Sequence, residues 1–176
     1  YWFRFGKDFD CAKGGKLPGL ASTGDLISGG ETPTGTNGFS LRLMWREDCT
    51  GEVYAYIPKA GNEHIQGNSG NLVVNSGTGI SYGWALGRGS FSFPKDRWVL
   101  IEMEARANTV GAKNGSVKVS LNNAVVYERK DLVMRSTYKL KFGRLFFSTF
   151  FGGNSAGFAA KKDERIYFGD VNLCPL

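Results

Sequence analysis

The chain has 176 residues, 41% of them hydrophobic, and a formal net charge of +6 at pH 7. This length predicts one domain with a substantial core. No apolar run approaches the roughly 18 residues that a membrane-spanning helix needs, and 25 glycines with 5 prolines fall short of a collagen-like or disordered composition. We therefore expect a globular domain without a membrane partner.

Eight short segments have the alternating, aromatic or β-branched pattern of strands, each bounded by Gly, Asn, Asp or Pro. They are residues 1–9, 38–46, 52–57, 97–106, 116–121, 124–129, 139–151 and 165–173. No stretch of ten residues combines a helical period with a cap at each end. Residues 1–176 are thus predicted to form a single all-β domain, either a sandwich or a jelly roll.

The connections divide into tight turns and long loops. Asn114-Gly115 and Asn122-Asn123 predict two-residue hairpin turns. Residues 21–37 and 61–79 are rich in Gly, Ser, Thr and Asn and are too long for hairpin turns, so we expect two long loops. Residues 10–19, with their glycines and Pro18, predict a sharp bend.

The cysteines and the single histidine limit the metal and redox chemistry. Cys11, Cys49 and Cys174 allow at most one disulfide and one free thiol, and the sequence leaves the pairing open. There is no C-x-x-C spacing, and His64 is the only histidine. A zinc site is therefore not expected, and we predict no metal and no cofactor.

Side-chain alternation selects four polar residues on one sheet face. Ser40 and Arg42 lie on the face of the second predicted strand that points away from its apolar residues. Tyr54 and Tyr56 do the same on the third predicted strand. Because the connection between these two strands is short, they should pair as an antiparallel hairpin with all four residues on one face.

This face has two interpretations. Tyrosines on strands covered by an arginine are typical of an ordinary amphipathic outer face. A guanidinium beside two phenols is also what a lyase of uronic-acid polymers needs. Such an enzyme must neutralise the sugar carboxylate before the C5 proton can be removed, and it needs a general base and a general acid.

Several motifs resemble those of polysaccharide lyase family 14, the alginate and glucuronan lyases, and the resemblance runs over essentially the whole chain. Residues 13–19 (KGGKLPG), 39–46 (FSLRLMWR) and 51–58 (GEVYAYIP) are similar to three family signatures. Residues 87–91 (GRGSF) followed by Trp98, and residues 150–154 (FFGGN) followed by Tyr167-Phe168, resemble further elements of the family.

The resemblance implies a jelly-roll sandwich with a substrate cleft on its concave sheet and metal-independent β-elimination of polyuronates. Carried over by position, Lys16 matches the essential lysine, Ser40 and Arg42 match residues that hold substrate, and Tyr54 and Tyr56 match the paired tyrosines of the catalytic centre. As a hypothesis, Arg42 pairs with the sugar carboxylate and Ser40 adds a hydrogen bond. Lys16, on the bend above, neutralises charge or takes the C5 proton, and one tyrosine acts as acid or base. The sequence does not decide between these assignments.

Further expectations concern subsites, partners and location. Arg88, Lys139 and Lys141 are candidate substrate-binding cations, although residues of this kind are more often solvated surface residues. The position of Cys11, where an apolar residue is expected, suggests a buried thiol. The resemblance also suggests that a segment ahead of Tyr1 is missing. We expect a secreted monomer that acts on an anionic polysaccharide.

Two other functional classes remain open. A non-catalytic carbohydrate-binding module would share the jelly roll and an aromatic groove, but it would not need a lysine, an arginine and two tyrosines on one face. Nucleic-acid binding agrees with the charge of +6, but the basic residues are scattered and no recognition motif is present. We therefore expect no nucleic-acid partner.

Overall fold

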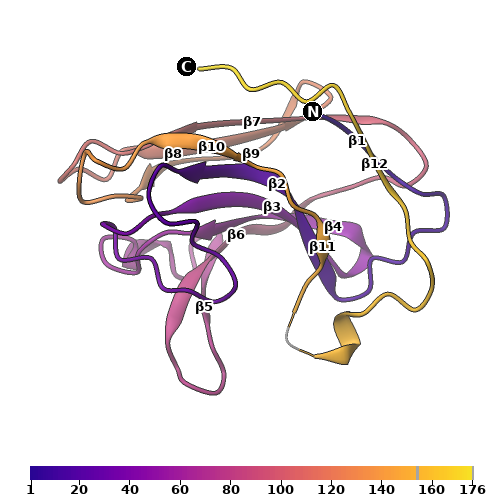
Figure 1. Ribbon diagram of the computed structural model, residues 1–176, viewed down its shortest axis with the longest axis horizontal. Coiled ribbons are helices and arrows are strands. Elements are labelled where there is room, and N and C mark those ends of the chain that lie inside the picture. Colours follow the sequence, from indigo (N-terminus) through magenta and orange to yellow (C-terminus); the bar gives the residue numbers. More distant parts are fainter. Residues whose placement is uncertain (154, 176) are drawn as a thin grey trace.

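The computed structural model describes residues 1–153 and 155–175, and these residues form two antiparallel sheets (Figure 1). The five-stranded sheet has the order β12-β1-β7-β8-β9. Its strands are β1 (Trp2–Phe5), β7 (Val99–Arg106), β8 (Gly115–Leu121), β9 (Ala124–Leu132) and β12 (Ile166–Gly169). The seven-stranded sheet has the order β10-β2-β3-β4-β6-β5, and β11 pairs with β2 next to β10. Its strands are β2 (Gly14–Ser22), β3 (Ser40–Arg46), β4 (Thr50–Tyr56), β5 (Gly70–Val74), β6 (Ser81–Ser92), β10 (Phe142–Phe146) and β11 (Phe150–Phe151).

Helical structure in the described residues is limited to three single turns of 3₁₀ helix. These are η1 (Glu47–Cys49), η2 (Glu63–Ile65) and η3 (Ala156–Phe158). None of the helices in residues 1–153 and 155–175 has the length and apolarity needed to cross a membrane. Asn154, the last residue of one motif noted above, lies outside the described residues, as does Leu176.

The two sheets pack face to face and enclose one large apolar core. Phe5 of β1 stacks on Phe9 with 4.0 Å between ring centroids and meets Trp45 of β3 edge-on at 5.5 Å. Val119 of β8 is buried in the same core. Aromatic rings that pack edge-on or stacked contribute more than their buried area alone. The predicted all-β jelly-roll sandwich is confirmed.

The predicted strands agree with the structure, and the predicted turns agree in part. Each of the eight predicted segments overlaps at least one strand, and residues 139–151 contain both β10 and β11. Asn122 and Asn123 have φ values of +49° and +67°, as a tight hairpin between β8 and β9 requires. Asn114-Gly115 is not a two-residue turn, because residues 107–114 form a longer loop between β7 and β8.

The glycine-rich bend predicted for residues 10–19 is wrong over most of its length, because β2 begins at Gly14 and runs as an interior strand between β3 and β10. Its glycines provide space rather than a turn. A Cβ at Gly15 would lie 2.1 Å from the Trp45 ring, and one at Gly19 would lie 2.1 Å from the main-chain oxygen of Leu41. Pro18 is accommodated at the irregularity in pairing between Lys16 and Gly19.

The second predicted long loop is also partly wrong. Residues 61–79 contain η2 and β5, and β5 pairs with β6, a strand that the sequence analysis did not predict. Glycines and polar residues interrupt the apolar residues throughout this hairpin, so no regular alternation marks it as a pair of strands. The first predicted loop is confirmed for residues 23–37, where it crosses the outer face of the seven-stranded sheet.

Candidate active site

The register between β3 and β4 places the four predicted polar residues on one face of the seven-stranded sheet. Ser40 pairs with Tyr56, and Arg42 pairs with Tyr54. This is the face turned away from the main core, since both tyrosines belong to a separate small apolar cluster with Ile27. The predicted shared face is therefore confirmed.

Lys16 lies on β2 and not on a loop above the sheet, which corrects the expected position. Its ammonium lies 3.0 Å from the centroid of the Tyr54 ring and 2.9 Å from the sulfur of Met44, its cross-strand neighbour. The residue is only 8% exposed. Burial, followed by the positive charge of Arg46, lowers the pKa of Lys16 well below its usual value.

Arg42 forms the floor of this face and is 1% exposed. Its Nε donates to the Leu17 carbonyl at 3.4 Å and one Nη donates to the Ser148 carbonyl at 2.6 Å. Its guanidinium stacks on Phe146 at 4.2 Å from the ring centroid and lies 5.4 Å from that of Phe150. Burial lowers the pKa of Arg42 to about 10, and a buried guanidinium with these partners holds a fixed position.

A carboxylate that the sequence analysis did not select, Glu52, sits on the same face and is fully buried. Its two oxygens accept from Arg46 and Arg88, each at 2.6 Å. Arg46 also lies 5.6 Å from the Tyr54 ring centroid. One carboxylate thus anchors two arginines beside Lys16, and the group as a whole retains an excess of positive charge.

Alternation alone could have identified the missed residues. Met44 and Arg46 share the face of Arg42 along β3, and Glu52 shares the face of Tyr54 along β4. The signal was present, but a methionine or a lone glutamate on a strand carries no specific chemistry until its neighbours are known.

The loop formed by residues 23–39 covers the end of the face that contains Ser40 and Tyr56. The Ser40 hydroxyl donates to the Ile27 carbonyl at 2.7 Å, and the Gly30 amide donates to the Tyr56 hydroxyl at 3.2 Å. Ser40 therefore anchors the loop in this structure, which is a different contact from the substrate hydrogen bond expected of it.

Burial determines the protonation of the two phenols. It raises the pKa of Tyr54, with further increases from Tyr56 and Tyr82, and it raises the pKa of Tyr56 as well. At neutral pH both tyrosines are therefore proton donors, while the neighbouring Lys16 amine loses its proton more readily than a surface lysine does.

The other two predicted binding cations lie apart from this cluster. Lys139 and Lys141 are exposed and flank Thr23, just beyond the end of β2, through main-chain contacts. Lys16, by contrast, pairs with Phe150 of β11. The structure brings Arg88 to the site but not Lys139 and Lys141.

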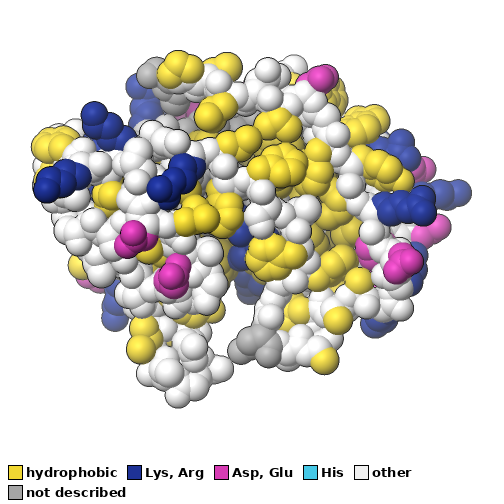
Figure 2. Space-filling view, in the orientation of Figure 1, with side chains coloured by type: hydrophobic (Ala, Val, Ile, Leu, Met, Phe, Trp, Pro, Cys, Tyr) yellow, Lys and Arg dark blue, Asp and Glu magenta, His cyan; other side chains and the backbone are white. Residues whose placement is uncertain are grey.

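Two projections border the face. The β5–β6 hairpin and the segment that carries η3 extend from the same side of the molecule, at the bottom of Figure 1. The space-filling view shows a notch between them, and hydrophobic side chains extend across the middle of the view, with most visible Lys and Arg side chains toward its edges (Figure 2). The face therefore lies between raised borders.

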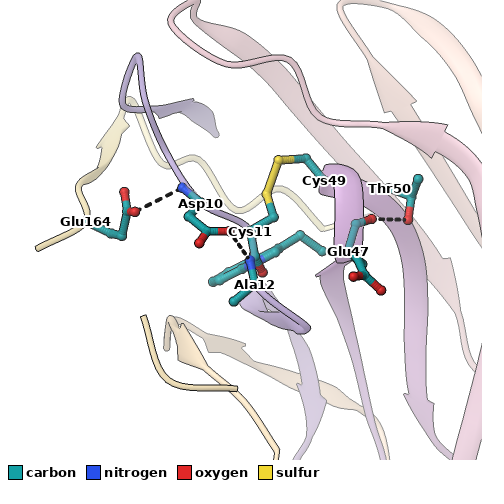
Figure 3. The surroundings of a disulfide bond; sticks show 8 residues. Asp10, Cys11, Ala12, Glu47, Cys49, Thr50 and Glu164 are labelled. Atoms are coloured by element: carbon teal, nitrogen blue, oxygen red, sulfur yellow. Dashed lines mark hydrogen bonds between the residues drawn. A yellow bond between two sulfur atoms is a disulfide. The ribbon is translucent and has the colours of Figure 1, made fainter. Parts of the chain in front are cut away.

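A disulfide between Cys11 and Cys49 joins the segment that precedes β2 to the turn between β3 and β4 (Figure 3). The expectation of a buried thiol at Cys11 is therefore wrong. The Asp10 amide donates to Glu164 at 3.0 Å, and the Ala12 amide donates back to Asp10 at 2.8 Å, which fixes the segment around the bond. Cys174 is the exposed free cysteine.

Comparisons with known proteins agree with this geometry. The family model Polysaccharide lyase 14 matches residues 1–171. The solved structure of the marine PL-14 alginate lyase from Aplysia kurodai is 37% identical with a TM-score of 0.78, over 94% of this chain and 64% of that one. Alginate lyase vAL-1 from Chlorella virus, at 24% identity and a TM-score of 0.68 over 86% of this chain and 60% of that one, has the same fold.

The chain spans less than two thirds of the length of both solved structures. A comparison with curated proteins found no match. The family model nevertheless covers residues 1–171, and the sequence motifs around Lys16, Arg42 and Tyr54 fall together on one face of the fold. The chain belongs to polysaccharide lyase family 14.

Proposed function

We propose that this chain cleaves a uronic-acid polymer, alginate or glucuronan, by β-elimination. The observation that carries the proposal is the burial of Lys16 against Tyr54 on a face that also holds three arginines and one carboxylate. Excess positive charge between raised borders suits a polyanion. The relative that is 37% identical is an alginate lyase, so alginate is the first substrate to test.

In the proposed step, the neutral amine of Lys16 takes the proton from C5 of the uronate. The electron pair of that C–H bond forms the C4–C5 double bond, the C4–O4 bond breaks, and a tyrosine hydroxyl protonates the departing O4. The pKa directions support this division, because Lys16 is shifted toward its neutral form and Tyr54 and Tyr56 toward their protonated forms.

Arg42 and Arg46 stabilise the negative charge that grows on the carboxylate of the reacting sugar. Two of the three Arg42 nitrogens already donate to main-chain carbonyls, so Arg42 acts mainly as a fixed positive charge on the floor of the site. The Ser40 hydroxyl can donate a hydrogen bond to substrate only when its contact with the Ile27 carbonyl is released. Because Lys16 and both tyrosines are largely buried, we include in the proposal that the loop of residues 23–39 shifts when polymer enters.

The direct test is incubation of the protein with alginate and with polyglucuronate, followed by ultraviolet absorbance of the conjugated unsaturated uronate. Only elimination creates that chromophore, so hydrolysis or simple binding leaves the absorbance unchanged. Binding without any absorbance change would instead support a carbohydrate-binding module and contradict the proposal.

Activity should not depend on a divalent cation. Among residues 1–153 and 155–175, no group of three or more His, Cys, Asp or Glu side chains is arranged to hold a metal ion, and arginines can neutralise the sugar carboxylate in its place. We expect full activity after treatment with EDTA and dialysis. Loss of turnover that calcium or magnesium restores would contradict the mechanism.

The Cys11–Cys49 disulfide supports the further proposal that the protein is secreted, because such bonds persist in oxidising compartments. We also propose that it acts as a monomer, since every group used in the proposed step comes from one chain. Fractionation of the native source and size-exclusion chromatography test these two points.

A further inference from the structure

A pocket of about 400 Å³ lies beside the Lys16 cluster, at the end of the face formed by β5 and β6. Its lining includes Ser69, Asn71, Ala85, Arg88, Ser90 and Tyr127. Ala85 of β6 is the cross-strand neighbour of Tyr54, so the pocket adjoins the residue that carries the proposed acid or base. Its volume falls within the range of about 300–1,000 Å³ that is typical of ligand sites.

The backbone of β6 directs Arg88 into this region. The pairing of β4 with β6 is irregular between Gly51 and Val53, and the glycines on either side of Arg88, Gly87 and Gly89, have φ values of +61° and +77°. Such irregularities re-aim a side chain, and these φ values favour glycine.

Glu52 fixes Arg88 without consuming all of its hydrogen-bonding capacity. The ion pair joins Arg88 Nε to Oε2 of the fully buried Glu52 at 2.6 Å. The Arg88 side chain is still 51% exposed and lines the pocket. An arginine held at Nε by a buried carboxylate can offer its terminal nitrogens to a second anion.

The other lining groups are uncharged, which defines the kind of ligand. Arg88 is the only charged side chain among the residues that line this pocket, and the others are glycines, one alanine, two serines, one asparagine and one tyrosine. Because Glu52 already serves two arginines, it does not cancel the charge of both. The combination suits a ligand that has one carboxylate and several hydroxyl groups.

We propose that this pocket is a subsite for a second uronate residue of the same polymer chain, with its carboxylate bound by Arg88 and its hydroxyls by Asn71 and Ser90. The inference rests on the proposed function. Its consequence is that substrate affinity increases once an oligouronate is long enough to reach from Tyr54 past Ala85 into the pocket.

The experiment compares wild type with Arg88→Gln, Arg88→Lys and Asn71→Ala on a series of oligouronates of increasing length. For long oligomers, Arg88→Gln should raise KM about 10- to 100-fold, as expected for loss of a charge-assisted hydrogen bond. Short oligomers that do not reach the pocket should be affected much less. Arg88→Lys keeps the charge and should recover part of the affinity, and Asn71→Ala should show a smaller effect with the same length dependence.

Arg106→Gln is the matched control, because Arg106 is an exposed arginine on β7 of the other sheet. Thermal unfolding of each variant verifies folding, and if Arg88→Gln does not fold, Asn71→Ala carries the test because it leaves the Glu52 pair intact. Equal losses on short and long oligomers, or a loss no greater than that of Arg106→Gln, would overturn the subsite.

Calorimetric binding of the same oligomers separates this inference from the proposed function. Wild type that binds with the length and Arg88 dependence described, but forms no unsaturated product, would retain the subsite and refute the lyase. Cleavage without length or Arg88 dependence in KM or in binding would retain the lyase and refute the subsite.

Discussion

The outward faces of the two sheets both carry charged side chains, but these differ in exposure and in the balance of charge. On the five-stranded sheet, the pairs Lys118–Glu104 and Lys130–Glu128 are matched one to one and remain in solvent. On the seven-stranded sheet, Lys16, Arg42 and Glu52 are almost completely buried, and cations outnumber carboxylates.

This difference distinguishes charged pairs that need no functional explanation from buried charges that do. Exposed pairs cost little and contribute little to stability. Buried charges lose hydration, and replacement of a buried ion pair by apolar residues is often neutral or stabilising. Because a buried group of cations that outnumbers its carboxylates does not stabilise the fold, we infer that it is retained for chemistry. The reaction is therefore placed on the seven-stranded sheet.

The largest effect is expected when the buried Lys16 is compared with Lys13, an exposed lysine three residues earlier in the chain. We expect Lys16→Ala to lower kcat for the proposed elimination about 100-fold or more, the scale of a general acid–base group. Lys13→Ala should mainly raise KM, with an effect that fades as salt screens the surface. Steady-state kinetics at two ionic strengths measure both effects.

Equal losses in the two lysine variants, fading together with salt, would show that this segment only gathers the polyanion. In that case the burial of Lys16 would have no catalytic meaning.

The disulfide reinforces the same sheet. It closes a loop across a sequence separation of 38 residues and holds the β3–β4 turn, where Asp48 and Cys49 have positive φ values. Replacing Cys11 and Cys49 together by serine should lower the free energy of unfolding by about 2–4 kcal/mol. Denaturant unfolding of the oxidised protein measures this loss, and Cys174→Ser is the control. A double variant as stable as that control would contradict the expectation.

Side-chain alternation along the strands could predict which residues share the face, but not how deeply they are buried. A period of two placed Ser40, Arg42, Tyr54 and Tyr56 together, and the short connection fixed the hairpin, so the register followed from local pattern. Whether those side chains are buried depends on segments distant in sequence. The loop of residues 23–39 contacts Ser40 and Tyr56, and residues 146–150 cover Arg42, and strand periodicity does not encode either contact.

The bend predicted from the glycines of residues 10–19 was wrong for a physical reason. Glycines in β2 create room for the Trp45 ring and the Leu41 carbonyl, whereas the sequence pattern alone favours a turn. Similarly, the role of Glu52 depends on Arg88 arriving from an irregular strand far along the chain. Contacts of this kind are visible only after the strands have been assembled.

Lys16 also links burial to stability through pH. Its pKa is lowered in the folded state, so between that value and the ordinary lysine pKa the unfolded chain binds more protons, and stability rises with pH. Below the lowered pKa both states are protonated and the cost of the buried cation is present in full. Lys16→Met removes that cost, so its gain in Tm over wild type should be greatest at low pH and shrink as pH rises toward the ordinary value.

Each 1 kcal/mol of this gain corresponds to about 2–4 °C in a protein of this size. Thermal unfolding of both proteins at several pH values gives the difference directly, because the other titrating groups are common to both. A constant difference in Tm across pH would mean that Lys16 is not held with a lowered pKa.

The smallest effect is expected on the opposite face. Lys130 is 71% exposed and pairs with Glu128 at 3.0 Å on the five-stranded sheet. Solvent and salt already screen this pair, so Lys130→Gln should leave the Tm within about 1 °C of wild type. It should also leave kcat and KM unchanged, because the sandwich core separates this face from Lys16 and Tyr54. Thermal unfolding and steady-state kinetics of this variant alongside Lys16→Ala complete the comparison of the two faces. If removing Lys130 lowered turnover as Lys16→Ala does, turnover would depend on the net positive charge of the molecule, and burial on one face would not be what makes a cation functional.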